Sequence, residues 1–219
     1  MKEEIEKFIP LIKTGQVSDA DIQQLISRIS HSIKEDSTRG KELGQLLGKI
    51  KQAAKEKDIH PAIHWVPVGN GFLAIGHKPG GKISFGGLKD EGTTAVLTLL
   101  NENEGAAQIG KQVTNQGMEW IWFPFSASRP YEGEAIAEVF ALYAQLQRLV
   151  TAGCKIYIHC SAGIHRTGMI TYGFLRFVGK EKTAAVELLQ TLRAVTAAQV
   201  GEEPLVWANQ FYQASDNIT

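Results

Sequence analysis

The side chains best suited to chemistry lie in one short segment, residues 156–168, IYIHCSAGIHRTG. Cys160 ends an apolar run there, and Arg166 follows six residues later. The five residues between them can curl so that successive backbone N–H groups point inward at the start of the next helix. Such a nest binds a tetrahedral dianion, and a planar guanidinium can hold two of its oxygens. The spacing therefore predicts a phosphate site.

The same loop activates its own nucleophile. Because N–H groups and the positive end of a helix lower the pKa of a thiol, Cys160 is expected to be largely thiolate at neutral pH. His159 is expected to hold the loop by hydrogen bonding, and Thr167 to donate to the sulfur as it leaves. The predicted chemistry is phosphoryl transfer to sulfur, followed by hydrolysis.

The surrounding pattern predicts elements that would place this loop at a sheet edge. Buried strands are expected at 93–100, 118–125 and 155–160, and a helix at 166–178. Further helices are expected at 106–115, 133–153, 182–193 and 204–212. Strands that alternate with helices predict an α/β fold with a central, partly parallel sheet flanked by helices. Active sites in such sheets lie at the carboxyl ends of the strands, where Cys160 stands.

The chain divides by composition into a helical segment, residues 1–57, and an α/β domain, residues 58–219. The first segment is polar, with apolar residues at helical spacing that predict two or three amphipathic helices. Such helices either pack on their own core or form an arm that binds a protein partner. The domain opens with two short β-rich runs around Gly69-Asn70-Gly71, which predicts a hairpin.

Residues 159–168, HCSAGIHRTG, resemble the HCxxGxxRTG signature of the cysteine-dependent protein tyrosine phosphatase superfamily. The resemblance extends over about residues 60–214, and the compact size is similar to the dual-specificity branch. It implies a phosphatase fold, a phosphocysteine intermediate on Cys160, and Arg166 as the group that stabilises the transition state. It implies no metal or organic cofactor. The implied phosphate-binding residues are Ser161, Ala162, Gly163, Ile164, His165 and Arg166.

The segment also departs from that family. Family members usually carry an aspartate that protonates the leaving group, on the loop after the preceding strand. The corresponding stretch, FPFSASRPYEGEAI, has none. Glu134 either supplies this proton or simply begins its helix, where the helix dipole favours a carboxylate. His165 is a further candidate, either as proton donor or as an inert residue at the rim.

Four residues are weaker candidates for substrate binding: Arg129, His77, Lys78 and Gln199. His77 and Lys78 follow a predicted strand and either edge the phosphate pocket or belong to a plain turn. Arg129 lies on the loop that lacks the aspartate. Gln199 either orders the hydrolytic water or is only exposed. The remaining alternative for Cys160 itself is a buried structural cysteine.

Three functions remain open at this point. The first is a phosphatase of tyrosine or dual specificity, whose missing aspartate predicts a preference for aryl over alkyl phosphates. The second is a phosphate-binding pseudophosphatase. The third is hydrolysis of a non-protein phosphate, such as an inositol phosphate, a phosphoinositide or an RNA 5′-phosphate.

Bulk properties limit the partners and the compartment. Acidic and basic residues number 23 each, so no global positive field exists to hold nucleic acid. No apolar run is long enough to span a bilayer, and the acidic start is unlike a signal peptide, so a soluble, cytoplasmic protein is expected. Cys154 and Cys160, if joined by extended chain, lie about 20 Å apart, which predicts reduced thiols.

Overall fold

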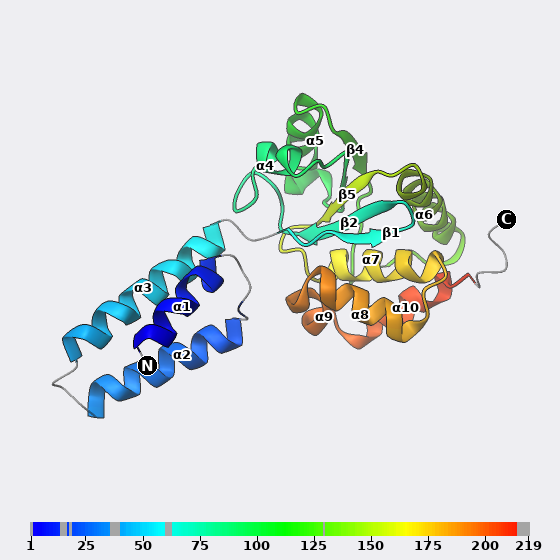
Figure 1. The fold of residues 1–219 in the computed structure, drawn as a ribbon. Coiled ribbons are helices and arrows are strands. Elements are labelled where there is room, and N and C mark those ends of the chain that lie inside the picture. Colours follow the sequence, from blue (N-terminus) through cyan, green and yellow to red (C-terminus); the bar gives the residue numbers. More distant parts are fainter. Residues whose placement is uncertain are drawn as a thin grey trace. The chain divides into compact units, whose positions relative to one another are not determined.

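The computed structural model describes residues 2–13, 17, 19–35, 40–59, 63–128 and 130–213 (Figure 1). The chain divides into two compact units, residues 1–62 and 63–219. No helix within the described ranges is long and apolar enough to cross a membrane.

The first unit consists of three helices: α1 (Lys2–Lys13), α2 (Asp19–Glu35) and α3 (Gly40–Ile59). α3 packs against both α1 and α2. Every third or fourth residue is apolar, so each helix places one stripe in a small core of its own. The buried members of this core are Ile5, Ile12, Val17, Ile22, Ile29, Leu43, Leu46, Ile50 and Ala53. α3 continues two residues past the predicted boundary at 57, and the assignment of separate domains stays a prediction.

The second unit is built on a five-stranded sheet in the order β1-β2-β5-β3-β4. Its strands are β1 (Val66–Val68), β2 (Gly71–Gly76), β3 (Ala95–Thr98), β4 (Glu119–Trp122) and β5 (Lys155–His159). β1 and β2 form the antiparallel hairpin predicted at the Gly-Asn-Gly turn, and the other pairs are parallel. The α/β class with a partly parallel sheet is therefore confirmed. β5 lies at the centre, with β2 on one side and β3 on the other.

Helices cover both faces of this sheet. The α-helices are α4 (Phe85–Asp90), α5 (Ala106–Asn115), α6 (Ile136–Thr151), α7 (His165–Phe177), α8 (Lys182–Leu192), α9 (Ala194–Gln199) and α10 (Glu202–Ala208). Short 3₁₀ turns are η2 (Glu102–Glu104), η3 (Gly133–Ala135) and η4 (Asn209–Phe211). In Figure 1, α4 and α5 lie on one side of the sheet and α7 to α10 on the other. α6 packs against α7, where the rings of Tyr143 and Phe174 lie 6.0 Å apart.

Two short helices were not predicted. α4 has the sequence FGGLKD, whose two glycines oppose helix formation. It forms because the Ser84 hydroxyl accepts a hydrogen bond from the Gly87 N–H at 2.9 Å, and because Leu88 is fully buried. α9 is only six residues long and lies within a stretch that carries no clear period. β4 is shorter than the predicted strand 118–125, and the helix expected at 204–212 ends in the 3₁₀ turn η4.

Candidate active site

Strand β5 delivers Cys160 to the carboxyl edge of the sheet. Ile156, Tyr157 and Ile158 are fully buried between the two helical layers, which fixes the strand firmly. Cys160 follows its last residue and is only 4% exposed. The next helix, α7, begins five residues later at His165, one residue before the start expected from the sequence. The segment between strand and helix is therefore short and tightly turned.

The loop turns its backbone toward the Cys160 sulfur. The Gly163 N–H donates to Sγ at 3.3 Å, and the Gly168 N–H closes the first turn of α7 on the Ile164 carbonyl at 2.7 Å. Gly163 has a φ of 69°, and a Cβ there would lie 2.1 Å from the Gly76 carbonyl oxygen. Only glycine satisfies both conditions. The loop thus depends on a close approach between β2 and the residues after β5.

The pKa of the Cys160 thiol lies below its ordinary value. Burial alone raises this pKa, but the Thr167 hydroxyl and the N–H groups of Thr167, Gly163 and Ile164 outweigh it. These donors stabilise the thiolate. The Thr167 hydroxyl is itself buried and has no hydrogen bond of ordinary geometry within the described part of the chain. We attribute its effect to proximity: it is an unused donor beside the sulfur, ready to bond the anion.

Arg166 is held by a carboxylate that sequence reasoning missed. Its two terminal nitrogens donate to the two oxygens of Glu104 at 2.6 and 2.7 Å, and Nη1 also approaches the Leu99 carbonyl at 3.3 Å. The bond from Arg166 lowers the pKa of Glu104 to about 2. The Glu104 carboxylate in turn raises the pKa of Arg166. Glu104 ends the turn η2, shortly after β3, so its position at the carboxyl edge of a neighbouring strand was the available signal.

A buried hydrogen-bond chain orients the carbonyl of Cys160. The Trp120 indole N–H can only donate, so the Thr98 hydroxyl accepts it at 3.0 Å. The Cys160 carbonyl can only accept, so Nδ1 of the neutral His159 ring must be its donor, and Nε2 must accept the hydrogen of the Thr98 hydroxyl, 2.9 Å away. Nδ1 of His159 therefore carries the ring proton and donates to the Cys160 carbonyl at 3.0 Å. Burial lowers the pKa of His159 to about 4, which keeps the ring neutral and this order of donors intact.

Arg193, also missed from the sequence, supports the loop from outside. Its Nη1 donates to the carbonyls of Ala162 and Gly163 at 2.9 and 2.8 Å. The Thr196 hydroxyl donates to the same Gly163 carbonyl at 2.6 Å. With these carbonyls bound outside, the N–H groups of the loop are free to face inward. Nη2 of Arg193 donates to Nε2 of His77 at 2.8 Å, so His77 belongs to this support.

Lys78 lies at the edge of the site. Its backbone N–H donates to the Ser161 carbonyl at 3.1 Å, which ties the turn after β2 to the phosphate loop. Lys78 also lines a cavity of about 350 Å³ together with Phe85, Glu104 and Gln108. A cation, two polar side chains and an aromatic ring therefore border the space next to the Arg166–Glu104 pair.

In the described part of the chain, no hydrogen bond joins the side chain of either proton-donor candidate, Glu134 or His165, to Cys160, Arg166 or Thr167. Glu134 is exposed within η3, and His165 is exposed at the first residue of α7. Gln199 is exposed at the last residue of α9. Arg129 lies outside the described residues.

The hydroxyls of Ser126 and Ser128 lie 3.2 Å from each other, in place of the expected aspartate. No group of three or more His, Cys, Asp or Glu side chains in the described ranges is arranged to hold a metal. Both cysteines are free thiols. The described residues at this site supply a thiol, backbone N–H groups and a guanidinium.

Comparison with known proteins gives structural matches only. No family model matches the sequence, and no curated protein matches it. Solved structures do match. One is kinase associated phosphatase (KAP), with its catalytic site cysteine replaced by serine, at a TM-score of 0.58 and 15% identity over 68% of this chain and 93% of that chain. The chain has the fold of the cysteine-dependent protein tyrosine phosphatases.

Two further structures support the same fold. PTPMT1 in complex with PI(5)P matches at a TM-score of 0.53 and 16% identity, over 68% of this chain and 94% of that chain. Tk-PTP in its active form matches at a TM-score of 0.52 and 16% identity, over 72% of this chain and 99% of that chain. The phosphatase fold expected from the HCSAGIHRTG segment is therefore confirmed.

Proposed function

We propose that the protein is a phosphatase that hydrolyses phosphate monoesters through a phosphocysteine on Cys160. The observation that carries this proposal is the position of the thiol: Sγ of Cys160 accepts a hydrogen bond from the Gly163 N–H at 3.3 Å. Its pKa is lowered, against the effect of burial, by the Thr167 hydroxyl and by the N–H groups of Thr167, Gly163 and Ile164. The same N–H groups are donors for phosphate oxygens, and Arg166 stands beside them with its orientation fixed by Glu104. A nucleophile and a dianion site thus share one loop.

The reaction proceeds in two displacements. In the first, the Cys160 thiolate attacks phosphorus, a P–S bond forms, and the P–O bond to the leaving group breaks. The loop N–H groups and Arg166 stabilise the charge that the three equatorial oxygens carry. In the second, water attacks phosphorus, the P–S bond breaks, and phosphate leaves. The Thr167 hydroxyl donates to the sulfur as the thiolate reforms.

The preferred substrate is an aryl phosphate, of which phosphotyrosine is the protein form. A phenoxide leaves readily without a proton, whereas an alkoxide needs a general acid worth about 10²–10⁴-fold in rate. Ser126 and Ser128 occupy the acid loop and bond each other, and neither is a useful acid. Glu134 and His165 remain candidates for a slower proton transfer. Lys78, at the edge of the cavity beside Glu104, is proposed to contact the rest of the substrate.

A second candidate is hydrolysis of a non-protein phosphate. It is favoured by the same cavity, because Lys78, Gln108 and Gln112 offer one positive charge and two amides to a hydroxylated or multiply charged group. PTPMT1, one of the structural neighbours, was solved with the phosphoinositide PI(5)P. A phosphate-binding protein without turnover is the third candidate, since the acid loop lacks its aspartate.

The deciding experiment measures hydrolysis of an aryl phosphate across pH by wild type, Cys160→Ser and Arg166→Ala. We expect a burst of phenol, a phosphocysteine that can be trapped by acid quench, and no turnover in Cys160→Ser. Activity that survives in Cys160→Ser would rule out the sulfur mechanism, and a wild type that binds phosphate without a burst would favour the binding protein. Rates on an alkyl phosphate and on PI(5)P, measured with wild type, Glu134→Gln and His165→Ala, separate the substrate classes and identify the acid.

A further inference from the structure

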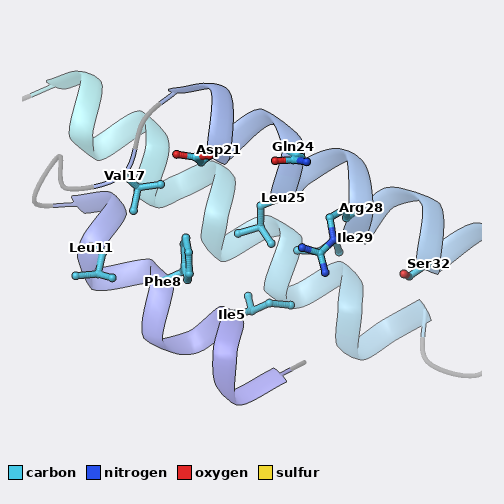
Figure 2. Close-up of a pocket in the computed structure, with 10 residues that line it drawn as sticks. All are labelled: Ile5, Phe8, Leu11, Val17, Asp21, Gln24, Leu25, Arg28, Ile29 and Ser32. Atoms are coloured by element: carbon cyan, nitrogen blue, oxygen red, sulfur yellow. The ribbon is translucent and has the colours of Figure 1, made fainter. Parts of the chain in front are cut away.

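The proposed reaction leaves two features of the structure unused. One is a cavity of about 740 Å³ between α1 and α2 of the helical unit, into which Phe8 and Leu25 point (Figure 2). The groups of the phosphate site are not among its lining residues, so it supplies none of that chemistry. The other is the side chain of His77, which contacts Arg193 and through it the phosphate loop, residues 160–166.

The turn after β2, residues 77–80, is held against the phosphate loop by its backbone. The Tyr157 hydroxyl donates to the His77 carbonyl at 2.8 Å, and the Lys78 N–H donates to the Ser161 carbonyl at 3.1 Å. Tyr157 is itself fully buried in the central strand, so this anchor is rigid. The backbone of His77 is therefore fixed, and its ring has a defined place beside the loop.

The side chain of His77 accepts a hydrogen bond from Arg193. Nη2 of Arg193 lies 2.8 Å from Nε2 of the ring, and a guanidinium carries donors only, so Nε2 must accept. The ring is then neutral and carries its proton on Nδ1. The same guanidinium donates through Nη1 to the carbonyls of Ala162 and Gly163 at 2.9 and 2.8 Å. One planar group therefore joins the ring of His77 to two carbonyls of the phosphate loop.

A proton on Nε2 of His77 is incompatible with this bond. It places two donors and two positive charges against each other at 2.8 Å, so the ring and the guanidinium must separate. Because the guanidinium is planar and rigid, a displacement of Nη2 also draws Nη1 away from the two loop carbonyls. We propose, on the basis of the phosphatase function proposed above, that His77 is a positioning residue: its neutral ring holds Arg193 on the phosphate loop, and its protonation releases that support.

The groups around this ring act on the added proton in opposite directions. Arg193 and Lys78 are cations and oppose it, whereas the Cys160 thiolate favours it. Tyr157 and His159 stay neutral, because burial raises the pKa of the phenol and lowers the pKa of the imidazole to about 4. A histidine ordinarily takes up its proton at about pH 6.5, so we expect the support to be released between about pH 7 and 5.

The test compares wild type with His77→Gln and His77→Ala across pH. One readout is kcat/KM on an aryl phosphate, and the other is alkylation of Cys160 by iodoacetamide in a Cys154→Ser background. The glutamine carbonyl can accept from Arg193 but does not titrate. At about pH 8 we expect His77→Gln to match wild type and His77→Ala to lose about three- to tenfold in kcat/KM, the effect of one hydrogen bond. At about pH 5 both readouts should be higher in His77→Gln than in wild type by the same factor, and wild type should fall to the level of His77→Ala.

Arg193→Ala tests whether the effect passes through the guanidinium. In that background histidine, glutamine and alanine at position 77 should give the same rates at every pH, because the group they act on is gone. A difference that persists in Arg193→Ala would assign the role of His77 to another contact and overturn the proposal. His64→Gln makes the same substitution at an exposed histidine of the same unit and should keep the wild-type profile. Far-UV circular dichroism at each pH checks that every variant is folded.

The two readouts distinguish failure of this positioning role from failure of the phosphatase function. Alkylation that depends on position 77 and on pH as stated, without turnover in any variant, would contradict the phosphatase function and support the role of His77. A His77→Gln profile that follows wild type in both readouts overturns that role, and so does a His77→Ala variant with the wild-type kcat/KM at about pH 8. A purely structural histidine predicts equal losses at every pH, which the comparison of glutamine with alanine would show.

Discussion

The carboxylate of Glu104 binds the guanidinium of Arg166 through two bonds, at 2.6 and 2.7 Å, across the carboxyl ends of neighbouring strands. The two side chains are 32% and 19% exposed, so water screens the pair only in part. A guanidinium fixed in this way needs no reorientation when charge develops on the phosphate, which is how preorganised groups lower a barrier. The pair therefore links the turn after β3 to the chemistry at the end of β5.

Replacing Glu104 by glutamine should reduce kcat/KM about 10- to 100-fold, since hydrogen bonds to charged groups contribute about 1.5–3 kcal/mol. Glutamine keeps the size of the side chain but has only one acceptor oxygen, so it cannot form the two parallel bonds that the two carboxylate oxygens accept from Arg166. Glu102→Gln is the matched control, because Glu102 is an exposed carboxylate at the start of the same turn. Equal losses in both variants would show that the turn, rather than the ion pair, matters.

The same pair predicts an acid-dependent part of the stability. The pKa of Glu104 is lowered to about 2 in the folded protein by its bond to Arg166, below the value of an unfolded chain. Between these two pKa values the unfolded state binds more protons than the folded state. The ion pair therefore adds to the free energy of unfolding above the pKa that Glu104 has in the unfolded chain, and this contribution is lost as the pH falls toward 2. Urea unfolding of wild type and Glu104→Gln should differ most at neutral pH. The difference should shrink between about pH 4.5 and 2. A gap that stays constant over that range would contradict the assignment.

The Thr167 hydroxyl should set the acidity of the nucleophile. In a Cys154→Ser background, Thr167→Val removes the hydroxyl at nearly constant volume and should raise the pKa of Cys160. Alkylation of Cys160 by iodoacetamide at mildly acidic pH should then slow, because less thiolate is present. Thr167→Ser keeps the donor and should react like the parent. An unchanged pH profile in Thr167→Val would assign the lowered pKa to the backbone N–H groups alone.

The sequence predicts those elements of the fold whose own residues carry a clear apolar period and clear end signals. The helix expected at 106–115 is found with those bounds, because its apolar spacing, its preceding glycine and its polar end all agree. α4 could not be predicted from helix propensity, because its two glycines disfavour a helix. The Ser84 cap and the burial of Leu88 in the tertiary structure stabilise it instead. Elements held by their own periodicity are predictable, and elements held by distant packing are not.

The candidate site likewise has a part that the sequence predicts and a part that it does not. The nucleophile, the guanidinium and the loop between them are contiguous, so their spacing alone indicates their chemistry. Glu104 lies 62 residues before Arg166, and Arg193 lies 30 residues after Gly163. Only the pairing of β3 with β5, and the return of α9 to the loop, bring these groups together. The place of Glu104 after a predicted strand indicates only which edge of the sheet it lies on, and the contact of Arg193 with the loop has no signature in one sequence.

Arg193 should act as a positioning residue. Arg193→Ala removes the donors from the Ala162 and Gly163 carbonyls, which frees those peptide groups to rotate and turns their neighbours' N–H groups away from the anion. We expect a fall in kcat/KM of about 10- to 100-fold, weaker inhibition by inorganic phosphate, and a higher pKa of Cys160. Arg193→Lys should recover part of each effect. Arg148→Ala, at an exposed arginine of α6, is the control. A loss of stability without a change in the Cys160 pKa would mean that Arg193 is only structural.

Gly163 should tolerate no side chain. Alanine there must hold a φ of 69° and place its Cβ 2.1 Å from the Gly76 carbonyl oxygen, so either the loop or the end of β2 has to move. The strained backbone alone costs about 1–3 kcal/mol. We expect Gly163→Ala to lower the free energy of unfolding by at least that amount and to abolish the phenol burst, because the N–H that meets the sulfur is displaced. Gly81→Ala, whose Cβ would meet nothing within 4 Å, should leave both unchanged. Normal burst kinetics in Gly163→Ala would show that the loop after β5 binds phosphate without this close approach to β2.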